Sequence, residues 1–203
     1  MNVTILNGNH DIENTGFDRY LHAYQVKLHK TGHYVKTYLL REMRIINSQN
    51  GSSEDTFADT KEPFDDVRYI INTLRETDLL VWACPLNQGF TSLLLKMVQD
   101  RIIGLWQPHV EMHANKWTVS QEYSKIPLMG VIVQREAETS QQDILLNKLI
   151  QERIAANLHT VLSFFITTEI SVTETVCETF RSFNYQLFIE NTCNDFLTNF
   201  TIR

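Results

Sequence analysis

Two polar turns, each placed between an apolar run and an amphipathic stretch, contain the residue types that could bind a ligand. The first turn follows the apolar run 3–6 and contains the Asn-Gly-Asn sequence 7–9. The second follows the apolar run 79–84 and reads Pro-Leu-Asn-Gln-Gly over 85–89. Helix N-termini have unpaired N–H groups, and glycine lets a backbone approach a ligand closely, so such turns can hold polar or anionic groups. We expect the two turns to share one ligand cleft.

Five short apolar runs alternate with helical patterns along the chain, and these elements must position the turns. The predicted strands are 3–6, 34–40, 79–84, 127–133 and 162–167, and the predicted helices begin at Asn14 or Thr15, at Pro63, at Thr91 or Ser92, at Ser140 and at Val172. Such alternation is typical of an α/β fold with a parallel sheet, helices on both faces and right-handed crossovers. We predict a three-layer sandwich with five parallel strands in the order 2-1-3-4-5, in which ligands bind beyond the carboxyl ends of the strands.

Three stretches do not fit this alternation. Residues 43–62 are polar and are expected to form an exposed loop, residues 107–125 are irregular, and residues 184–203 are a C-terminal extension of uncertain structure. Loops this long in a compact domain are usually functional or disordered. The length of 203 residues fits one domain spanning 1–203.

Composition excludes several classes of protein. The net charge of −6 and the lack of a cluster of Lys and Arg argue against nucleic-acid binding, and no apolar run is long enough to span a membrane. The first residues lack a basic region and a cleavage site. The three cysteines are an odd count without Cys-x-x-Cys spacing, which indicates free thiols in a reducing compartment. We expect a cytoplasmic protein.

A metal site is not expected. His109 and His113 are four residues apart and could share one helical face, but Glu111 between them does not complete a known zinc motif, and no third ligand is evident.

The two turns and their flanks resemble those of the NAD(P)H-dependent FMN reductases. In that family the first loop typically reads Gly-Ser-Pro-Arg followed by Gly-Asn-Thr, and here Gly8-Asn9-His10-Asp11 is followed by Asn14-Thr15. Residues 77–92 resemble the family's strand that ends in Ser-Pro-x-Tyr before a small-residue helix cap. Residues 95–101 continue the match, where the family usually has Lys-x-Phe-x-Asp-Arg. The likeness covers roughly residues 1–133.

This resemblance implies a flavodoxin-like fold, bound FMN, NADH or NADPH as co-substrate, a homodimer, and hydride transfer through the flavin to a small acceptor such as a flavin or a quinone. The flavin performs the redox step, so no catalytic side chain is required. Asn9, Asn14 and Thr15 would hold the FMN phosphate, with Gly8 allowing close backbone approach. The residues implied along the isoalloxazine edge are Pro85, Leu86, Asn87, Gln88 and Gly89.

Residues near the remaining edge of the cleft allow more than one interpretation. Gln134 and Arg135 follow the fourth predicted strand, and Arg135 could meet the flavin or a dianionic ligand, or simply be exposed. The aromatic residues Trp106, Trp117 and Tyr123 could stack on a flavin or nicotinamide, contact a second subunit, or pack ordinarily.

The chain departs from the family pattern at Asp11, where the family has arginine. A carboxylate about 5 Å from a phosphate costs roughly 1–3 kcal/mol, which weakens binding about 5- to 150-fold unless the side chain points away. The loop 43–62 also lacks cysteines that many relatives carry. Two alternatives therefore stay open: a flavodoxin-type electron carrier, whose Thr-x-Thr-Gly-x-Thr loop is not matched here, and a non-catalytic relative with weakened flavin binding.

Overall fold

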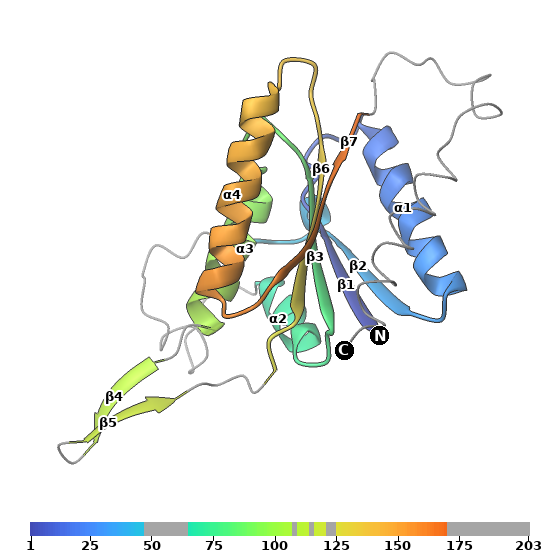
Figure 1. Ribbon diagram of the computed structural model, residues 1–203. Helices are drawn as coiled ribbons and strands as arrows, with labels where there is room; N and C mark the ends of the chain where they lie inside the picture. Colours follow the sequence, from blue (N-terminus) through green and yellow to red (C-terminus); the bar gives the residue numbers. More distant parts are fainter. Residues whose placement is uncertain (47–64, 107–108, 114–115, 121–124, 170–203) are drawn as a thin grey trace.

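The computed structural model describes residues 1–46, 65–106, 109–113, 116–120 and 125–169, and for 105–120 it describes the backbone only. Within these ranges the chain forms a five-stranded sheet and a separate two-stranded hairpin. The sheet strands are β1 (Asn2–Asn7), β2 (Tyr34–Leu39), β3 (Leu79–Pro85), β6 (Leu128–Gln134) and β7 (Leu162–Thr168). All neighbouring strands are parallel, in the order β2-β1-β3-β6-β7 (Figure 1). This order confirms the predicted 2-1-3-4-5 sheet.

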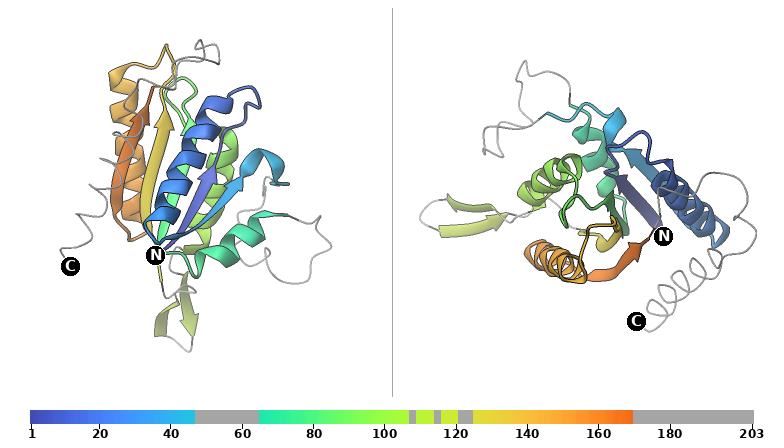
Figure 2. Two further views of the ribbon diagram at one scale, coloured as in Figure 1. Left: turned by 90° about the vertical axis from the view of Figure 1, so that its right-hand side faces the viewer. Right: turned by 90° about the horizontal axis from the view of Figure 1, so that it is seen from above.

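Helices cover both faces of the sheet, as the alternation predicted. One face is covered by α1 (Thr15–Lys30), and the other by α2 (Val67–Leu74), α3 (Leu93–Trp106) and α4 (Gln141–Asn157), as the two buried clusters and Figure 2 show. A short 3₁₀ turn, η1 (Leu40–Glu42), follows β2. The strand β3 is buried along its whole length, because it lies in the centre of the sheet with helices on both sides.

Capping side chains set where the helices begin. Asn14 Oδ1 accepts a hydrogen bond from Phe17 N at 3.4 Å, and Ser140 with Asp143 forms a capping box at the start of α4. The helix α2 begins at Val67, later than the predicted start at Pro63, which lies outside the described residues. Asp65 precedes this helix, and its Oδ1 accepts from Val67 N at 2.9 Å.

The stretch 107–125 contains a hairpin that the sequence analysis did not predict. Its strands, β4 (His109–His113) and β5 (Lys116–Ser120), are antiparallel and project away from the sheet (Figure 1). His109 and His113 therefore lie on a strand, where residues four apart are separated by about 13 Å, too far to bind one metal ion. The proposed helical face for these two histidines was wrong.

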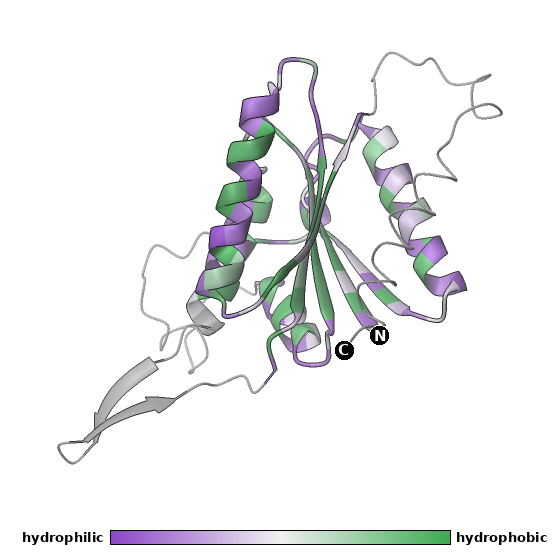
Figure 3. Cartoon of the chain, in the orientation of Figure 1, coloured by the Kyte–Doolittle hydropathy of each residue, from purple (hydrophilic) through white to green (hydrophobic). Residues whose placement is uncertain are grey.

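Hydropathy follows the layers of the sandwich. Figure 3 shows apolar residues along the central strands and on the sides of the helices that face them. The helix α4 also carries apolar residues on its outer side, at Leu145, Leu146, Leu149 and Ile150.

Several predicted features lie outside the described residues. They are most of the loop 43–62, the helix that was expected to begin at Val172, the extension 184–203 and Tyr123. The single domain over 1–203 stays a prediction.

Candidate functional site

The loops after β1 and β3 meet at the carboxyl edge of the sheet, and Gly8 makes this possible. Gly8 N donates to Ala83 O at 2.7 Å. A Cβ atom at position 8 would lie 2.7 Å from Ser92 Oγ and 2.8 Å from Leu95 Cβ. Only glycine lets the first loop pack this closely against the start of α3, so the predicted convergence of the two turns is a property of the structure.

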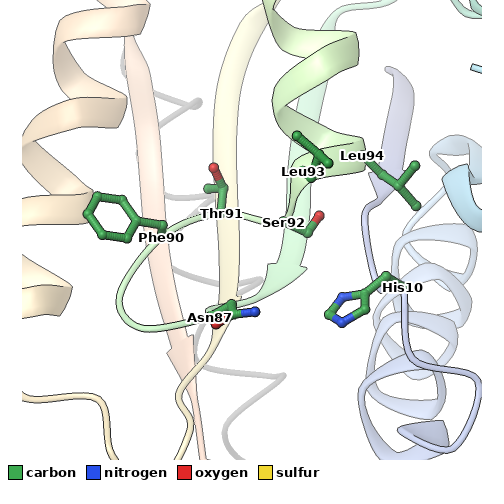
Figure 4. Close-up of a pocket in the computed structure, with 7 residues that line it drawn as sticks. All are labelled: His10, Asn87, Phe90, Thr91, Ser92, Leu93 and Leu94. Carbon is green, nitrogen blue, oxygen red and sulfur yellow. The ribbon is translucent and has the colours of Figure 1, made fainter. Parts of the chain in front are cut away.

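A pocket of about 420 Å³ opens where these loops meet, within the range of small-molecule sites. In Figure 4 His10 from the first loop and Asn87 from the second point toward one another across it. Phe90 and Leu93 line the pocket and are exposed to solvent by 58% and 75%. The other lining residues are Thr91, Ser92 and Leu94.

The second turn is a tight two-residue hairpin turn. Asn87 and Phe90 exchange both backbone hydrogen bonds at 2.9 Å, and the two residues between them have positive φ angles, +50° at Gln88 and +81° at Gly89. Positive φ at both central positions is the signature of a type I′ turn, which favours glycine.

The helix α4 holds this turn in place. Asn147 Nδ2, which is buried, donates to Gly89 O at 3.1 Å. A Cβ at Gly89 would lie 2.7 Å from Asp143 Cβ. The space beside Gly89 is therefore occupied by Asp143.

The end of β6 ties the first two loops together through Gln134. Leu86 N donates to Gln134 O at 2.9 Å, and Asn14 Nδ2 donates to Gln134 Oε1 at 2.7 Å. Pro85 and Leu86 are buried, so Asn87 and Gln88 are the exposed members of the predicted ring edge. Gln134 thus connects the loop after β1 with the turn after β3.

The first loop uses its own side chains as hydrogen-bond acceptors. Asn9 N donates to Asn7 Oδ1 at 2.9 Å, Asp11 N donates to Asn9 Oδ1 at 3.1 Å, and Glu13 N donates to Asp11 Oδ1 at 2.8 Å. This series of Asx turns folds the Asp11 carboxylate back onto its own loop. Among the described residues, the N–H groups of His10 and Ile12 have no acceptor.

Beneath the loop lies an ion pair. Arg41 Nη2 is 2.9 Å from Asp18 Oδ2, and Asn7 Nδ2 and Asn9 Nδ2 donate to Asp18 Oδ1 at 2.7 and 3.2 Å. Burial acts to raise the pKa of Asp18, but the bonds from Arg41, Asn7 and Asn9 outweigh it, and the pKa lies below its ordinary value. Asp18 is therefore ionised near neutral pH and anchors the loop to α1.

Two of the predicted phosphate ligands have donors committed to the protein. Asn9 is fully buried, and its Nδ2 also donates to Asn14 O at 3.0 Å. Asn14 divides its side chain between the helix cap and Gln134. Thr15 is exposed, and its Oγ1 accepts from Arg19 Nη2 at 3.3 Å.

Arg135 is held at the side of the cleft. Its Nε donates to Thr139 O at 2.9 Å, and its Nη1 is 3.1 Å from Glu169 Oε1. The guanidinium therefore stabilises the turn after β6, and binding a dianion would require it to give up these partners.

Cys84 lies behind the first loop and is fully buried. Burial raises the pKa of its thiol to about 12. The thiolate needed for nucleophilic or redox chemistry is therefore not formed near neutral pH.

Some lining residues were not identified from the sequence. In the sequence analysis His10 appeared only as part of the first loop's motif, and Phe90, Leu93 and Leu94 carried no ligand-binding role. Their common signal is position, since each lies within a few residues of a junction between strand and helix at this edge. The ion pair between Asp18 and Arg41 joins a helix to the end of β2, and no local pattern indicates it.

The described residues contain no group of His, Cys, Asp or Glu that could hold a metal ion. Among the same residues, no helix is both long and apolar enough to cross a bilayer.

Comparison with solved structures agrees with this architecture. The chain is similar to an NAD(P)H:quinone oxidoreductase from Methanothermobacter marburgensis, with 15% identity, a TM-score of 0.58 and coverage of 97% of this chain and 94% of the other. An FMN-dependent NADH-azoreductase from Bacillus anthracis, solved with FMN, matches with 11% identity, a TM-score of 0.53 and coverage of 97% and 96%. An apo NADH:FMN oxidoreductase matches with 10% identity, a TM-score of 0.55 and coverage of 96% and 87%.

These matches define the class of fold. The chain has the flavodoxin-like α/β fold, and these solved neighbours with the same fold are named as two oxidoreductases and an azoreductase that use NADH or NAD(P)H. No family model matches the sequence. No curated protein matches it either.

The site fits the two ends of a phosphorylated flavin unequally. The pocket beside the type I′ turn offers apolar surface and polar backbone groups, which suit a planar ring with a polar edge. The first loop, which leads into α1, presents the unpaired N–H groups of His10 and Ile12, which can donate to an oxygen-rich group. However, the exposed carboxylates of Asp11 and Glu13 lie in that loop, so its charge does not fit a dianion.

Proposed function

We propose that this protein is a flavin-dependent NAD(P)H:acceptor oxidoreductase, with FMN as the flavin and a small molecule such as a flavin or quinone as the acceptor. The observation that carries the proposal is the convergence of the loops after β1 and β3, which Gly8 brings into contact at the carboxyl edge of the sheet. That edge is where open α/β sheets bind their ligands. The structural neighbours named as reductases support the same chemistry.

The residues of this chain would bind and orient, and a bound flavin would supply the hydride transfer. Asn87 and Gln88 would face the polar edge of the ring, with the turn held by Asn147 and Asp143 of α4. Phe90 and Leu93 would exclude water from one side of the pocket. Gly8, Asn9, Asn14 and Thr15 would shape the loop that receives the flavin's ribityl end.

A titration with FMN, followed by quenching of flavin fluorescence, tests the proposal. We expect binding, bleaching of the flavin absorbance by NADH or NADPH without oxygen, and recovery of the absorbance when a quinone is added. A Thr91→Phe variant, which fills the pocket, should bind FMN at least tenfold more weakly. Val161→Phe is the matched control, because Val161 is exposed at the opposite edge of the sheet.

The outcomes separate the alternatives. Tight FMN binding without reduction by either nicotinamide would identify an electron carrier instead of an enzyme. No binding of flavin and no oxidation of NADH or NADPH would contradict the proposal and favour a non-catalytic relative.

We also propose a homodimer in the cytoplasm. The outer side of α4 exposes Leu145, Leu146, Leu149 and Ile150 by 38–57%, and apolar patches of this kind often mark protein interfaces. Light scattering should give the mass of a dimer for the wild type and of a monomer for Leu145→Ser/Leu149→Ser. A wild-type monomer at micromolar concentration would contradict the dimer. The buried free thiol of Cys84 supports a reducing compartment.

A further inference from the structure

The loop that would receive the flavin phosphate has few N–H groups available to bind an anion. Hydrogen bonds within the loop take up the N–H groups of Asn9, Asp11 and Glu13, and their acceptors are side chains two residues earlier. The side-chain amides of Asn9 and Asn14 are committed as well. A phosphate here would have to rely on the few N–H groups that are left.

The charges around this loop also oppose a phosphate. Asp11 and Glu13 are exposed carboxylates within the loop, and Asp18 lies beneath it. Of the nearby guanidinium groups, that of Arg41 is paired with Asp18, and that of Arg19 bonds to Thr15 on the first turn of α1. A dianion would therefore enter a region that already carries excess negative charge, which weakens its binding several-fold or more.

The pocket that would hold the flavin ring lacks the carboxylates of the first loop. No titratable side chain other than that of His10 lines the pocket, among the residues the structure describes. Four of its lining residues, Asn87 and Thr91 to Leu93, offer neutral side chains and backbone groups near the start of α3. Affinity for a neutral, planar ligand does not depend on the charge of the first loop.

We propose that this chain selects its flavin by the ring, and that Asp11 and Glu13 act as specificity residues that disfavour the terminal phosphate. The site therefore accepts unphosphorylated riboflavin at least as well as FMN. This inference rests on the proposed function only in requiring that a flavin binds. It concerns which flavin is held, and no redox step enters it.

Binding measurements on the flavin-free protein test the proposal directly. FMN and riboflavin are titrated separately at low and at moderate salt, and quenching of their fluorescence gives each Kd. For the wild type we expect the Kd for FMN to equal or exceed that for riboflavin. Added salt should tighten FMN binding, because it screens repulsion, and should leave riboflavin binding unchanged.

The decisive variant is Asp11→Asn/Glu13→Gln. Asparagine at position 11 keeps an oxygen that can accept from Glu13 N, so the Asx turn is retained. We expect FMN to bind at least fivefold more tightly and riboflavin to bind as before. The control is Glu76→Gln/Glu152→Gln, which removes the same charge at exposed positions outside the loop and should change neither Kd.

Each result decides the matter. Wild-type FMN binding that is tighter than riboflavin binding would overturn the inference alone, and so would an Asp11→Asn/Glu13→Gln variant with unchanged FMN affinity. If neither flavin binds, the proposed function fails and the inference fails with it. Melting curves of the variants show that each protein is folded.

Discussion

The loop after β1 and the turn after β3 lie side by side, but different contacts stabilise them. The first loop stabilises itself, because its polar side chains accept hydrogen bonds from its own backbone and the Asp18–Arg41 pair anchors it from below. The second turn is held from outside, since α4 supplies Asn147 as donor and Asp143 as packing surface. The self-contained loop has few donors to offer a ligand, whereas the externally held turn presents its surface to the pocket.

The largest expected effect comes from breaking the contact between the second turn and α4. Gly89→Ala combines a backbone with φ of +81° and a Cβ 2.7 Å from Asp143, so we expect a loss of about 2–4 kcal/mol in the free energy of unfolding. Gly32→Ala is a matched control with φ of +84° and open space, and should lose only about 1 kcal/mol. Urea denaturation measures both. Equal losses would show that α4 does not constrain the turn.

The next effect comes from separating the two loops. Gly8→Ala places a Cβ against Ser92 and Leu95, and overpacking of this kind costs about 1–3 kcal/mol. Flavin affinity should fall together with stability, because the pocket forms between the loops. In Gly104→Ala the added Cβ meets nothing within 4 Å outside the adjacent backbone of α3, among the residues that the structure describes, so this change should raise stability by up to about 1 kcal/mol. If Gly8→Ala kept full stability and affinity, the convergence of the loops would not matter for binding.

A smaller effect is expected from the anchor of the first loop. The pKa of Asp18 is lowered in the folded protein, so its ionised form stabilises the fold above its unfolded pKa of about 3.9, and this contribution is lost as pH falls through the folded pKa. Asp18→Asn should cost about 1 kcal/mol at pH 7 and much less at pH 3. Thermal melting across this range measures the difference. Asp100→Asn, in an exposed pair with Lys96, should show almost no change, and a pH-independent deficit for Asp18→Asn would contradict the anchor.

The last prediction is that the Cys84 thiol does not react with an alkylating reagent in the folded protein. In a protein with Cys177→Ser and Cys193→Ser, iodoacetamide should not modify the remaining thiol at pH 7.5 until denaturant is added, because the buried thiol has a pKa raised to about 12. Mass spectrometry measures the modification. The same thiol should react faster in Gly8→Ala, where the loop that covers it is displaced. Rapid labelling of the folded wild type would show that the loop opens.

Much of the architecture could be predicted because it depends on local patterns. The apolar runs 79–84 and 127–133 are long enough for buried strands, and alternation with helices restricts them to a parallel sheet. The cap at Ser140 with Asp143 three residues later marked the start of α4 directly. The hairpin 109–120 was missed although both of its strands alternate polar and apolar residues, because each strand is only five residues long and the surrounding stretch was interpreted as irregular. The roles of the individual site residues stay predictions.

The sequence by itself determined the alternation of strands and helices, the turn residues that follow the first and third strands, and the departure at Asp11, since each depends on residue types within a short stretch. Only the tertiary structure decided what the polar residues of that edge are paired with. Asn9 and Asn14 could have faced a ligand, but Asp18 and Gln134 lie close enough to accept their hydrogen bonds. The physical reason is that a side chain's partners depend on distances between segments far apart in the chain, which no local pattern specifies.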